Sequence, residues 1–231
     1  MRDDICTIPV SEVFEHNDGC PICRMRDTIE ERMTDYILGD AMMEPDVRIE
    51  TNKTGFCEHH YNNMMSRRGR LQLALMLQTH INEINGEIFK KKLFNTDSKK
   101  TGNAKNITDS CFICSKIEWG LSRMIETVYR CYETQKDFRD MFNSQSMFCL
   151  PHYERLLGGA SKRNMKSYYS EFSENLNRIT GGYSKSLYDD LSKYCTMYDY
   201  RSRDGETDWG NSRDAVERTV AFLNGRVYKE D

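Results

Sequence analysis

The chain carries two copies of one arrangement of cysteine and histidine residues, and this arrangement limits how it can fold. In each copy a Cys-x-x-Cys pair is followed by a Cys-x-x-His pair, after a spacer of 33 residues in the first copy and 34 in the second. The candidate ligands are Cys20, Cys23, Cys57 and His60 in the first copy, and Cys111, Cys114, Cys149 and His152 in the second. Three thiolates and one imidazole complete a tetrahedral zinc site. The sequence therefore predicts two zinc ions, each held by four donors from one copy.

The similarity of the two copies extends beyond these pairs. Four further positions recur, namely Asp18, Ile22, Phe56 and Tyr61 in the first copy as Asp109, Ile113, Phe148 and Tyr153 in the second. The recurrence predicts an internal duplication of one helical module that is clipped by a metal. Because the metal would close each long spacer at both ends, we expect metal binding to contribute much of the folding free energy.

The cysteines allow other interpretations. Disulfides are disfavoured, because nine cysteines are an odd number and the N-terminal segment shows no apolar signal sequence. An iron–sulfur cluster stays open as an alternative to zinc, since it uses the same soft donors. Cys6, Cys131 and Cys195 have no counterpart in either copy and are expected to be buried free thiols. His59 could replace its neighbour His60 as the ligand.

The composition predicts an all-α fold. The chain has only four prolines among 231 residues, and apolar residues recur at helical spacing behind each Cys-x-x-Cys and each Cys-x-x-His pair. The expected division is a first metal-binding helical repeat at residues 1–94, a flexible polar linker at 95–106, a second repeat at 107–180 and a C-terminal helical extension at 181–231. A last helix is expected to stop at Gly225.

Composition also limits the cellular location and the classes of binding partner that are expected. With 38% hydrophobic and 30% charged residues, the sequence contains no stretch able to span a bilayer, and a cytoplasmic protein without membrane contact is expected. The formal net charge of −3 argues against general coating of nucleic acid. Local basic patches could still bind it.

Further polar residues are candidates for a role. His80 lies on a predicted apolar helix, where a hydrogen-bonded core histidine is the favoured interpretation. Arg48 follows Glu44 and Asp46, and residues 199–204 likewise mix arginine with carboxylates. Both groups are predicted to form buried ion pairs that lock loops, in preference to lining a ligand pocket.

Longer segments resemble a known family. They are Ala41-Met-Met-Glu-Pro-Asp46, Gly55-Phe-Cys57 through His60, Leu73-Ala-Leu-Met-Leu-Gln-Thr-His80, Phe148-Cys-Leu-Pro-His152, and Asp199-Tyr-Arg201 followed by Asp208-Trp-Gly-Asn-Ser212, together with both Cys-x-x-Cys pairs. On these segments the chain resembles the domain of unknown function family 6062 over nearly its whole length. The resemblance implies a cytoplasmic bacterial protein from an uncharacterised family, and it assigns no catalytic residue.

Three classes of function fit these observations. The favoured class is a zinc-stabilised helical binding or scaffold protein that recruits a protein or nucleic acid. The alternatives are an iron–sulfur or metal-sensing redox protein, and an enzyme with a pocket between the repeats lined by His80, Arg48 or Arg201. The enzyme is the least favoured, because the sequence contains no phosphate loop, dinucleotide fingerprint, nucleophile elbow or zinc-protease helix.

Overall fold

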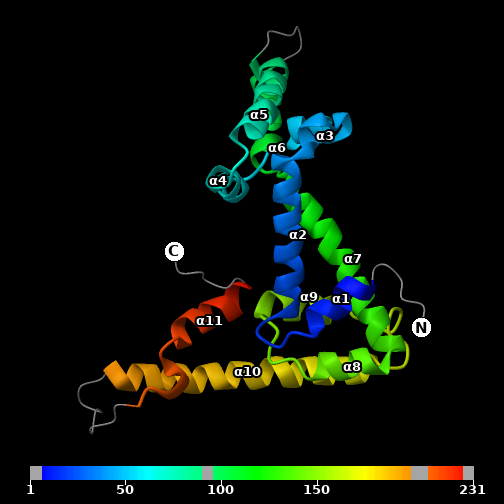
Figure 1. The fold of residues 1–231 in the computed structure, drawn as a ribbon, viewed down its shortest axis with the longest axis vertical. Helices are drawn as coiled ribbons and strands as arrows, with labels where there is room; N and C mark the ends of the chain where they lie inside the picture. The colour runs from blue at the N-terminus through cyan, green and yellow to red at the C-terminus, as the bar shows by residue number, and fades with distance from the viewer. Residues whose placement is uncertain (1–6, 90–95, 199–207, 226–231) are drawn as a thin grey trace. The chain divides into compact units, whose positions relative to one another are not determined.

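The structure is a computed structural model that describes residues 7–89, 96–198 and 208–225. For residues 7–9 it describes the backbone alone. All regular secondary structure in these ranges is helical (Figure 1), so the predicted all-α class is confirmed. None of the described helices combines the length and the apolar character that crossing a membrane requires.

The chain forms two compact units. Unit 1 consists of Met1–Met25 and Ser122–Asp231, and unit 2 consists of Arg26–Leu121. Both boundaries fall inside long helices, α2 (Pro21–Leu38) and α7 (Phe112–Thr134). The units therefore cut across the two sequence copies, because each contains the Cys-x-x-Cys pair of one copy and the Cys-x-x-His pair of the other.

Unit 1 is built on the long helix α10 (Tyr169–Tyr198), which continues without interruption through the expected division at residue 180. Its other elements are α1 (Thr7–Phe14), the start of α2, the end of α7, α8 (Lys136–Asn143), α9 (Leu150–Gly159), the 3-10 turn η3 (Gly210–Ser212) and α11 (Ala215–Asn224). As predicted, α11 stops at Gly225, which takes the left-handed conformation with a φ of 68°.

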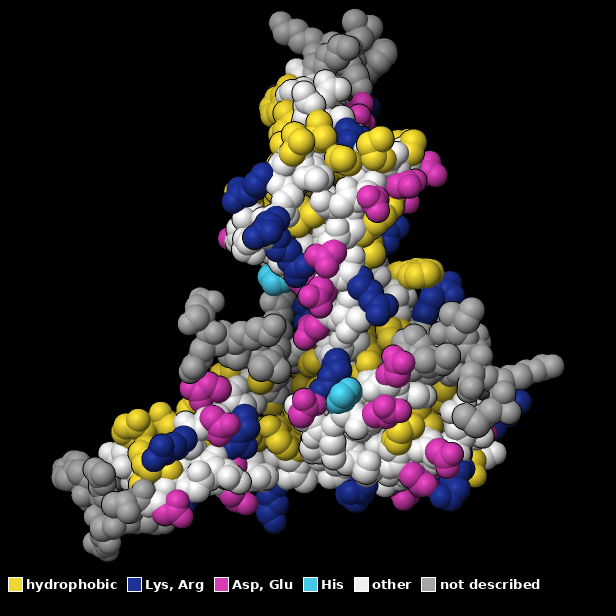
Figure 2. Space-filling view, in the orientation of Figure 1, with side chains coloured by type: hydrophobic (Ala, Val, Ile, Leu, Met, Phe, Trp, Pro, Cys, Tyr) yellow, Lys and Arg dark blue, Asp and Glu magenta, His cyan; other side chains and the backbone are white. Residues whose placement is uncertain are grey.

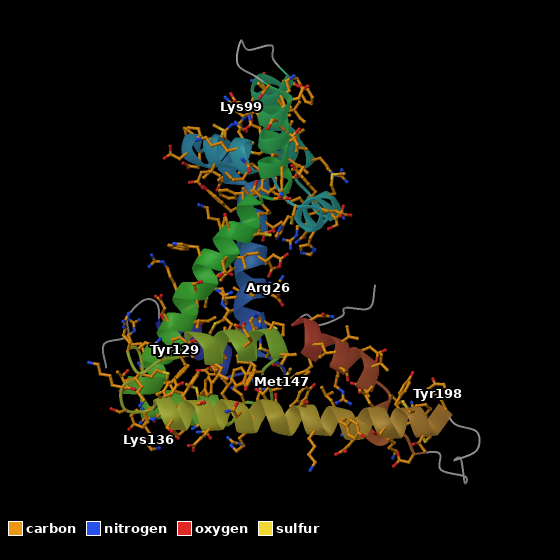
Figure 3. All side chains as sticks on the ribbon, turned by 180° about the vertical axis from the view of Figure 1, so that it is seen from behind. Arg26, Lys99, Tyr129, Lys136, Met147 and Tyr198 are labelled. Carbon is orange, nitrogen blue, oxygen red and sulfur yellow. The ribbon has the colours of Figure 1, made fainter. Side chains whose placement is uncertain are left out.

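An aromatic cluster forms the core of unit 1. The fully buried ring of Phe142 lies at its centre, with ring centroids 4.9 Å from Phe148, 5.0 Å from Phe172, 5.1 Å from Tyr132 and 5.6 Å from Phe14. The cluster thus joins α1, α7, α8 and α10 with the segment before α9. At its edge the Tyr129 hydroxyl (Figure 3) donates to the backbone oxygen of Leu156 at 2.9 Å, which fixes α9 against α7.

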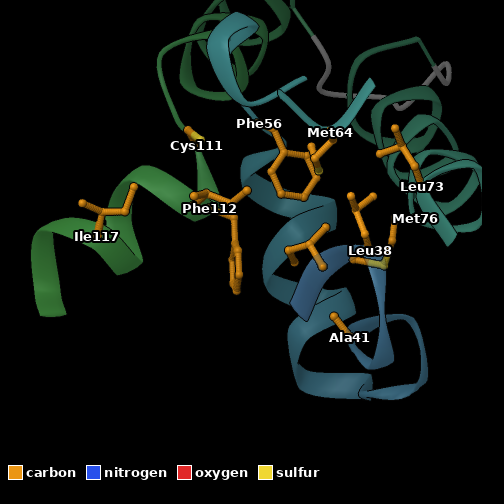
Figure 4. Packing of buried hydrophobic residues seen from close by; sticks show 11 residues of the cluster. Leu38, Ala41, Phe56, Met64, Leu73, Met76, Cys111, Phe112 and Ile117 are labelled. Carbon is orange, nitrogen blue, oxygen red and sulfur yellow. The ribbon is translucent and has the colours of Figure 1, made fainter. Parts of the chain in front are cut away.

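Unit 2 packs its helices around a second apolar core. Its elements are the rest of α2, the 3-10 turn η1 (Asp40–Met43), α3 (Pro45–Thr54), α4 (Glu58–Ser66), α5 (Arg70–Ile84), the π-helical turn η2 (Asn85–Phe89), α6 (Asp97–Thr108) and the start of α7. Phe56, Met64, Phe112 and Cys111 meet in this core (Figure 4). The Phe112 N–H donates to the Gly55 backbone oxygen at 3.0 Å, which ties the start of α7 to the segment before α4.

The predicted flexible linker at residues 95–106 is wrong for its described part, because residues 97–106 belong to helix α6. The side-chain oxygen of Thr96 caps the helix by accepting from the Lys99 N–H at 3.4 Å. None of the α6 side chains is buried, although the helix packs beside α3 and η2. A polar composition therefore marked a surface helix here rather than a loop.

Replacing Phe142 with alanine is predicted to lower the free energy of unfolding by about 3–5 kcal/mol, because the cavity would open at the centre of the aromatic cluster. The matched control is Tyr188→Ala on the exposed face of α10, for which a change within about 0.5 kcal/mol is expected. Urea unfolding followed by circular dichroism compares the two. Equal losses would contradict the placement of Phe142.

Candidate metal centres

The structure gathers the eight predicted ligands into two groups. Centre 1, in unit 1, consists of Cys20, Cys23, Cys149 and His152, and centre 2, in unit 2, consists of Cys57, His60, Cys111 and Cys114. Within each centre one donor atom from each of the four residues lies within 4.8 Å of the other three. Both groups could therefore hold a metal ion.

The predicted grouping within one sequence copy is wrong. Each centre combines the Cys-x-x-Cys pair of one copy with the Cys-x-x-His pair of the other. The reason is that each Cys-x-x-Cys pair starts a long helix, α2 with 18 residues and α7 with 23. At 1.5 Å per residue these helices carry the chain about 27 Å and 34 Å away from the pair before the Cys-x-x-His pair of the same copy follows.

Helix starts place the donors of both centres. In centre 1 the cysteine pair lies at the start of α2, while Cys149 is the residue before α9 and His152 lies in its first turn. Centre 2 repeats this with α7 and with α4, which begins directly after Cys57. The partial positive charge of a helix N-terminus favours thiolate. Ile22 and Ile113, between the paired cysteines, are fully buried and anchor the two turns.

The donor spacings in centre 1 suit a tetrahedral metal site. His152 Nδ1 lies 3.1 Å from Cys149 Sγ, 3.3 Å from Cys23 Sγ and 3.6 Å from Cys20 Sγ, and the sulfurs of Cys23 and Cys149 are 3.6 Å apart. A tetrahedral zinc site with bonds of about 2.0–2.3 Å has edges of about 3.3–3.8 Å, and of the four separations only the 3.1 Å one is shorter. All four residues are buried.

Gly225, at the end of α11, covers centre 1. Its backbone oxygen lies 3.1 Å from Cys23 Sγ. A side chain at this position would meet the donors, because an added Cβ would lie 3.1 Å from Cys149 Sγ, and the φ of 68° also disfavours any residue with a Cβ. The sequence marked Gly225 as a helix stop, but nothing in it indicated the contact with the cysteines.

Centre 2 has the same donors at similar distances. His60 Nδ1 lies 3.1 Å from Cys57 Sγ, 3.3 Å from Cys111 Sγ and 3.5 Å from Cys114 Sγ, and the sulfurs of Cys57 and Cys114 are 3.8 Å apart. The Cys114 N–H also donates to Cys111 Sγ at 3.4 Å. Burial differs from centre 1, because His60 and Cys111 are buried, Cys57 is half-buried and Cys114 is exposed.

A carboxylate lies next to the Nε2 atom of the centre 2 histidine. Glu30 Oε1 lies 3.3 Å from His60 Nε2, in a direction outside hydrogen-bond geometry, and 2.6 Å from His59 Nε2. Arg26 pairs with the other carboxylate oxygen at 3.3 Å. A carboxylate behind a ligating imidazole fixes the ring and raises its basicity. His60 rather than His59 is the candidate ligand, because its Nδ1 faces the three sulfurs.

Sequence reasoning missed Glu30. It belongs to no recurring pattern, and the position seven residues after the second cysteine, which is Glu30 in the first copy, is Leu121 in the second. One carboxylate among the residues of α2 does not by itself indicate a functional role. Only the fold brings it to the histidine.

The close packing of the side chains in centre 2 shifts their pKa values. Burial acts to lower the pKa of His60, but its contacts with Cys111 and Glu30 raise that pKa to about 10. Burial likewise raises the pKa of Cys111, yet His60 and nearby backbone N–H groups lower it to about 6. Burial and the neighbouring Cys111 raise the pKa of Cys114 to about 12. The close contact with His60, partly opposed by burial, lowers the pKa of Glu30 to about 2.

Centre 1 shows the same competition between sulfurs. Burial opposes ionisation of Cys20, but contacts with Cys149, Cys23 and His152 hold its pKa well below the ordinary value. Contacts with Cys149 and Cys20 raise the pKa of Cys23, and the contact with Cys20 raises that of Cys149 to about 12. Three thiolates cannot share such a space without a cation, and a bound divalent metal would supply one.

The other predicted residues have mixed outcomes. The buried ring of His80 donates from Nδ1 to the Asn52 backbone oxygen at 2.8 Å, so the core-histidine prediction is confirmed. Arg48 donates to the backbone oxygens of Met42 and Leu75 and to the Thr79 hydroxyl, so its predicted ion pair with a carboxylate is wrong. It locks η1 and α3 to α5 through neutral oxygens. Residues 199–204 lie outside the described residues.

The remaining cysteines are unpaired where the structure describes them. Cys131 is a buried free thiol, as predicted. The same prediction is wrong for Cys195, because this residue lies on the exposed side of α10. Cys6 lies outside the described residues.

Gly225→Ala is predicted to destabilise unit 1 by about 1–2 kcal/mol or more, because the left-handed conformation disfavours alanine and the new methyl group would press on Cys149. Gly181→Ala is the matched control, since this exposed helical glycine has no atom within 4 Å of an added Cβ, and alanine there should stabilise by about 0.5–1 kcal/mol. Unfolding of both variants in urea gives the two signs. A neutral Gly225→Ala would refute the close contact.

Glu30→Gln is predicted to weaken metal binding at centre 2 by about 10- to 100-fold, because an amide supports the imidazole less well than a carboxylate. Centre 1 should keep its affinity. Competition with a chromogenic chelator measures both affinities in one titration. Unchanged binding at centre 2 would show that Glu30 does not support His60.

Comparison with known proteins gives a family but no function. No curated protein and no solved structure matches the chain significantly. A family of unknown function, DUF6062, matches residues 1–230, as the sequence motifs indicated. The chain belongs to the DUF6062 family.

Proposed function

We propose that the protein is a zinc-stabilised helical binding or scaffold protein in which both centres hold a structural Zn²⁺. The observation that carries the proposal is the donor geometry. In each centre, the imidazole nitrogen lies 3.1–3.6 Å from all three sulfurs, and two of the sulfurs lie 3.6–3.8 Å apart. These separations fit around one tetrahedral ion.

The donor set supports a structural role over a catalytic one. Hydrolytic zinc needs an open coordination position for water, and four protein donors leave none. Glu58, next to Cys57, is exposed and would have no metal-bound water to activate. The metal instead would cross-link segments that are distant in sequence, the starts of α2 and α9 in unit 1 and of α4 and α7 in unit 2.

Such metal cross-links contribute a large part of the free energy of folding. Structural zinc contributes about 10–16 kcal/mol to the folding of zinc-finger peptides at neutral pH. The net stability of a typical domain is about 5–15 kcal/mol. Loss of either metal is therefore expected to unfold much of the unit that contains it.

Exposed apolar side chains of unit 2 support a protein partner. Met43, Leu71 and Phe89 are 74%, 69% and 71% exposed, and Figure 2 shows hydrophobic side chains at the surface over α3 and α5. Single exposed apolar side chains are ordinary, but hydrophobic side chains that gather over two helices, as in Figure 2, are typical of interaction surfaces. A nucleic acid partner is less favoured, because the net charge is −3 and binding to phosphates requires excess cations.

Protein purified without oxygen is predicted to be colourless and to contain two zinc ions per chain. Cobalt substitution should give the visible absorption of tetrahedral thiolate-bound Co²⁺ at two equivalents, and removal of the metals should lower the helical circular dichroism signal. Iron with acid-labile sulfide would instead establish the iron–sulfur alternative. Fewer than two metal equivalents would contradict the proposal.

Cys57→Ser and Cys149→Ser are each predicted to lose one metal ion and to destabilise one unit strongly, unit 2 and unit 1 respectively. Cys195→Ser is the control, because this exposed thiol belongs to neither centre, and its stability should change by no more than about 0.5 kcal/mol. Metal content and thermal melting report the difference. Similar melting of all three variants would refute the ligand assignment.

A further inference from the structure

The two centres differ in how far solvent reaches their sulfurs. All four residues of centre 1 are buried, and the chain at Gly225 lies against Cys23 and Cys149. In centre 2, by contrast, Cys57 is half-buried and Cys114 is exposed. A dissolved oxidant could therefore reach centre 2 and would be excluded from centre 1.

The two accessible sulfurs of centre 2 are also close together. Cys57 Sγ and Cys114 Sγ are 3.8 Å apart, and a disulfide requires a separation of about 2.05 Å. In the metal-loaded site proposed above both residues are ligands and therefore thiolates, and thiolate is the form that reacts with oxidants. The geometry therefore brings reactivity, access and proximity together in one pair of cysteines.

We propose that centre 2 is an oxidant-sensitive metal site that releases its ion when Cys57 and Cys114 form a disulfide, whereas centre 1 retains its ion. The proposal rests on the metal-binding function proposed above. It makes the two centres unequal, with centre 1 as a permanent structural site and centre 2 as a reversible one.

Hydrogen peroxide would oxidise the two cysteines in two steps. The Cys114 thiolate attacks one peroxide oxygen, the O–O bond breaks, and a sulfenic acid and one hydroxide form. The Cys57 thiolate then displaces the second hydroxide from the Cys114 sulfur and the S–S bond forms. Two protons from solvent convert both hydroxides to water. Two thiolates have then lost one electron each, and hydrogen peroxide has been reduced to two water molecules.

The consequence for the metal follows from the loss of donors. The disulfide removes two of the four ligands and leaves only His60 and Cys111, which cannot hold the ion tightly. The new S–S bond still joins the starts of α4 and α7. Unit 2 would therefore exchange one cross-link for another as its metal leaves, and a reductant with zinc would restore the first state.

The test uses full-length protein that carries Cys6→Ser and Cys195→Ser. These substitutions remove two thiols that belong to neither centre: Cys195 is exposed, and Cys6 lies outside the described residues. The protein, loaded with two zinc ions, is treated with hydrogen peroxide in the presence of a chromogenic chelator. We expect one equivalent to be released at least tenfold faster than the second. Peptide mapping should then find the disulfide Cys57–Cys114, with Cys20, Cys23 and Cys149 still reduced.

The outcomes separate this inference from the metal proposal. If the starting protein cannot bind two metal ions, the metal proposal itself fails. If it binds two but releases both at the same rate, loses the ion of centre 1 first, or forms a disulfide between Cys111 and Cys114, the inference is overturned while the metal sites stand. Rebinding of the zinc equivalent that was released first, after reduction, would support the reversible role of centre 2.

Discussion

The fold depends on the crossed pairing of cysteine and histidine donors at helix starts. Neither Cys-x-x-Cys pair meets the Cys-x-x-His pair that follows it most closely in the sequence. Instead, α2 and α7 each start at one centre and run out of the compact unit that contains it. For this reason unit 2 is one continuous segment inserted between the two segments of unit 1, and unit 1 is assembled from both ends of the sequence.

Much of the candidate site could be predicted from the sequence, because donor type and spacing are local properties. The all-α class, the helix stop at Gly225 and the core role of His80 also follow from local patterns. The pairing of the donors could not be predicted, since both the crossed and the uncrossed arrangement give three sulfurs and one imidazole per ion. What decides between them is the length of α2 and α7, which a motif does not contain.

The errors have a common physical origin. Residues 97–106 are polar because α6 is a surface helix, and composition alone does not distinguish such a helix from a loop. Arg48 is satisfied by backbone and hydroxyl oxygens, although carboxylates lie nearer in sequence. Glu30 and Gly225 reach the centres only through packing. For Arg48, Glu30 and Gly225, a partner distant in sequence determines the role of the residue.

The most direct test of the crossed pairing is the metal content of two double variants after a wash with chelator. Cys20→Ser with Cys149→Ser removes two donors from centre 1 and none from centre 2, so one metal ion per chain is predicted to remain. Cys20→Ser with Cys57→Ser removes one donor from each centre, so both ions are predicted to be lost. The reverse result, with one ion kept only in the second variant, would show that each site is built within one sequence copy and would contradict the account.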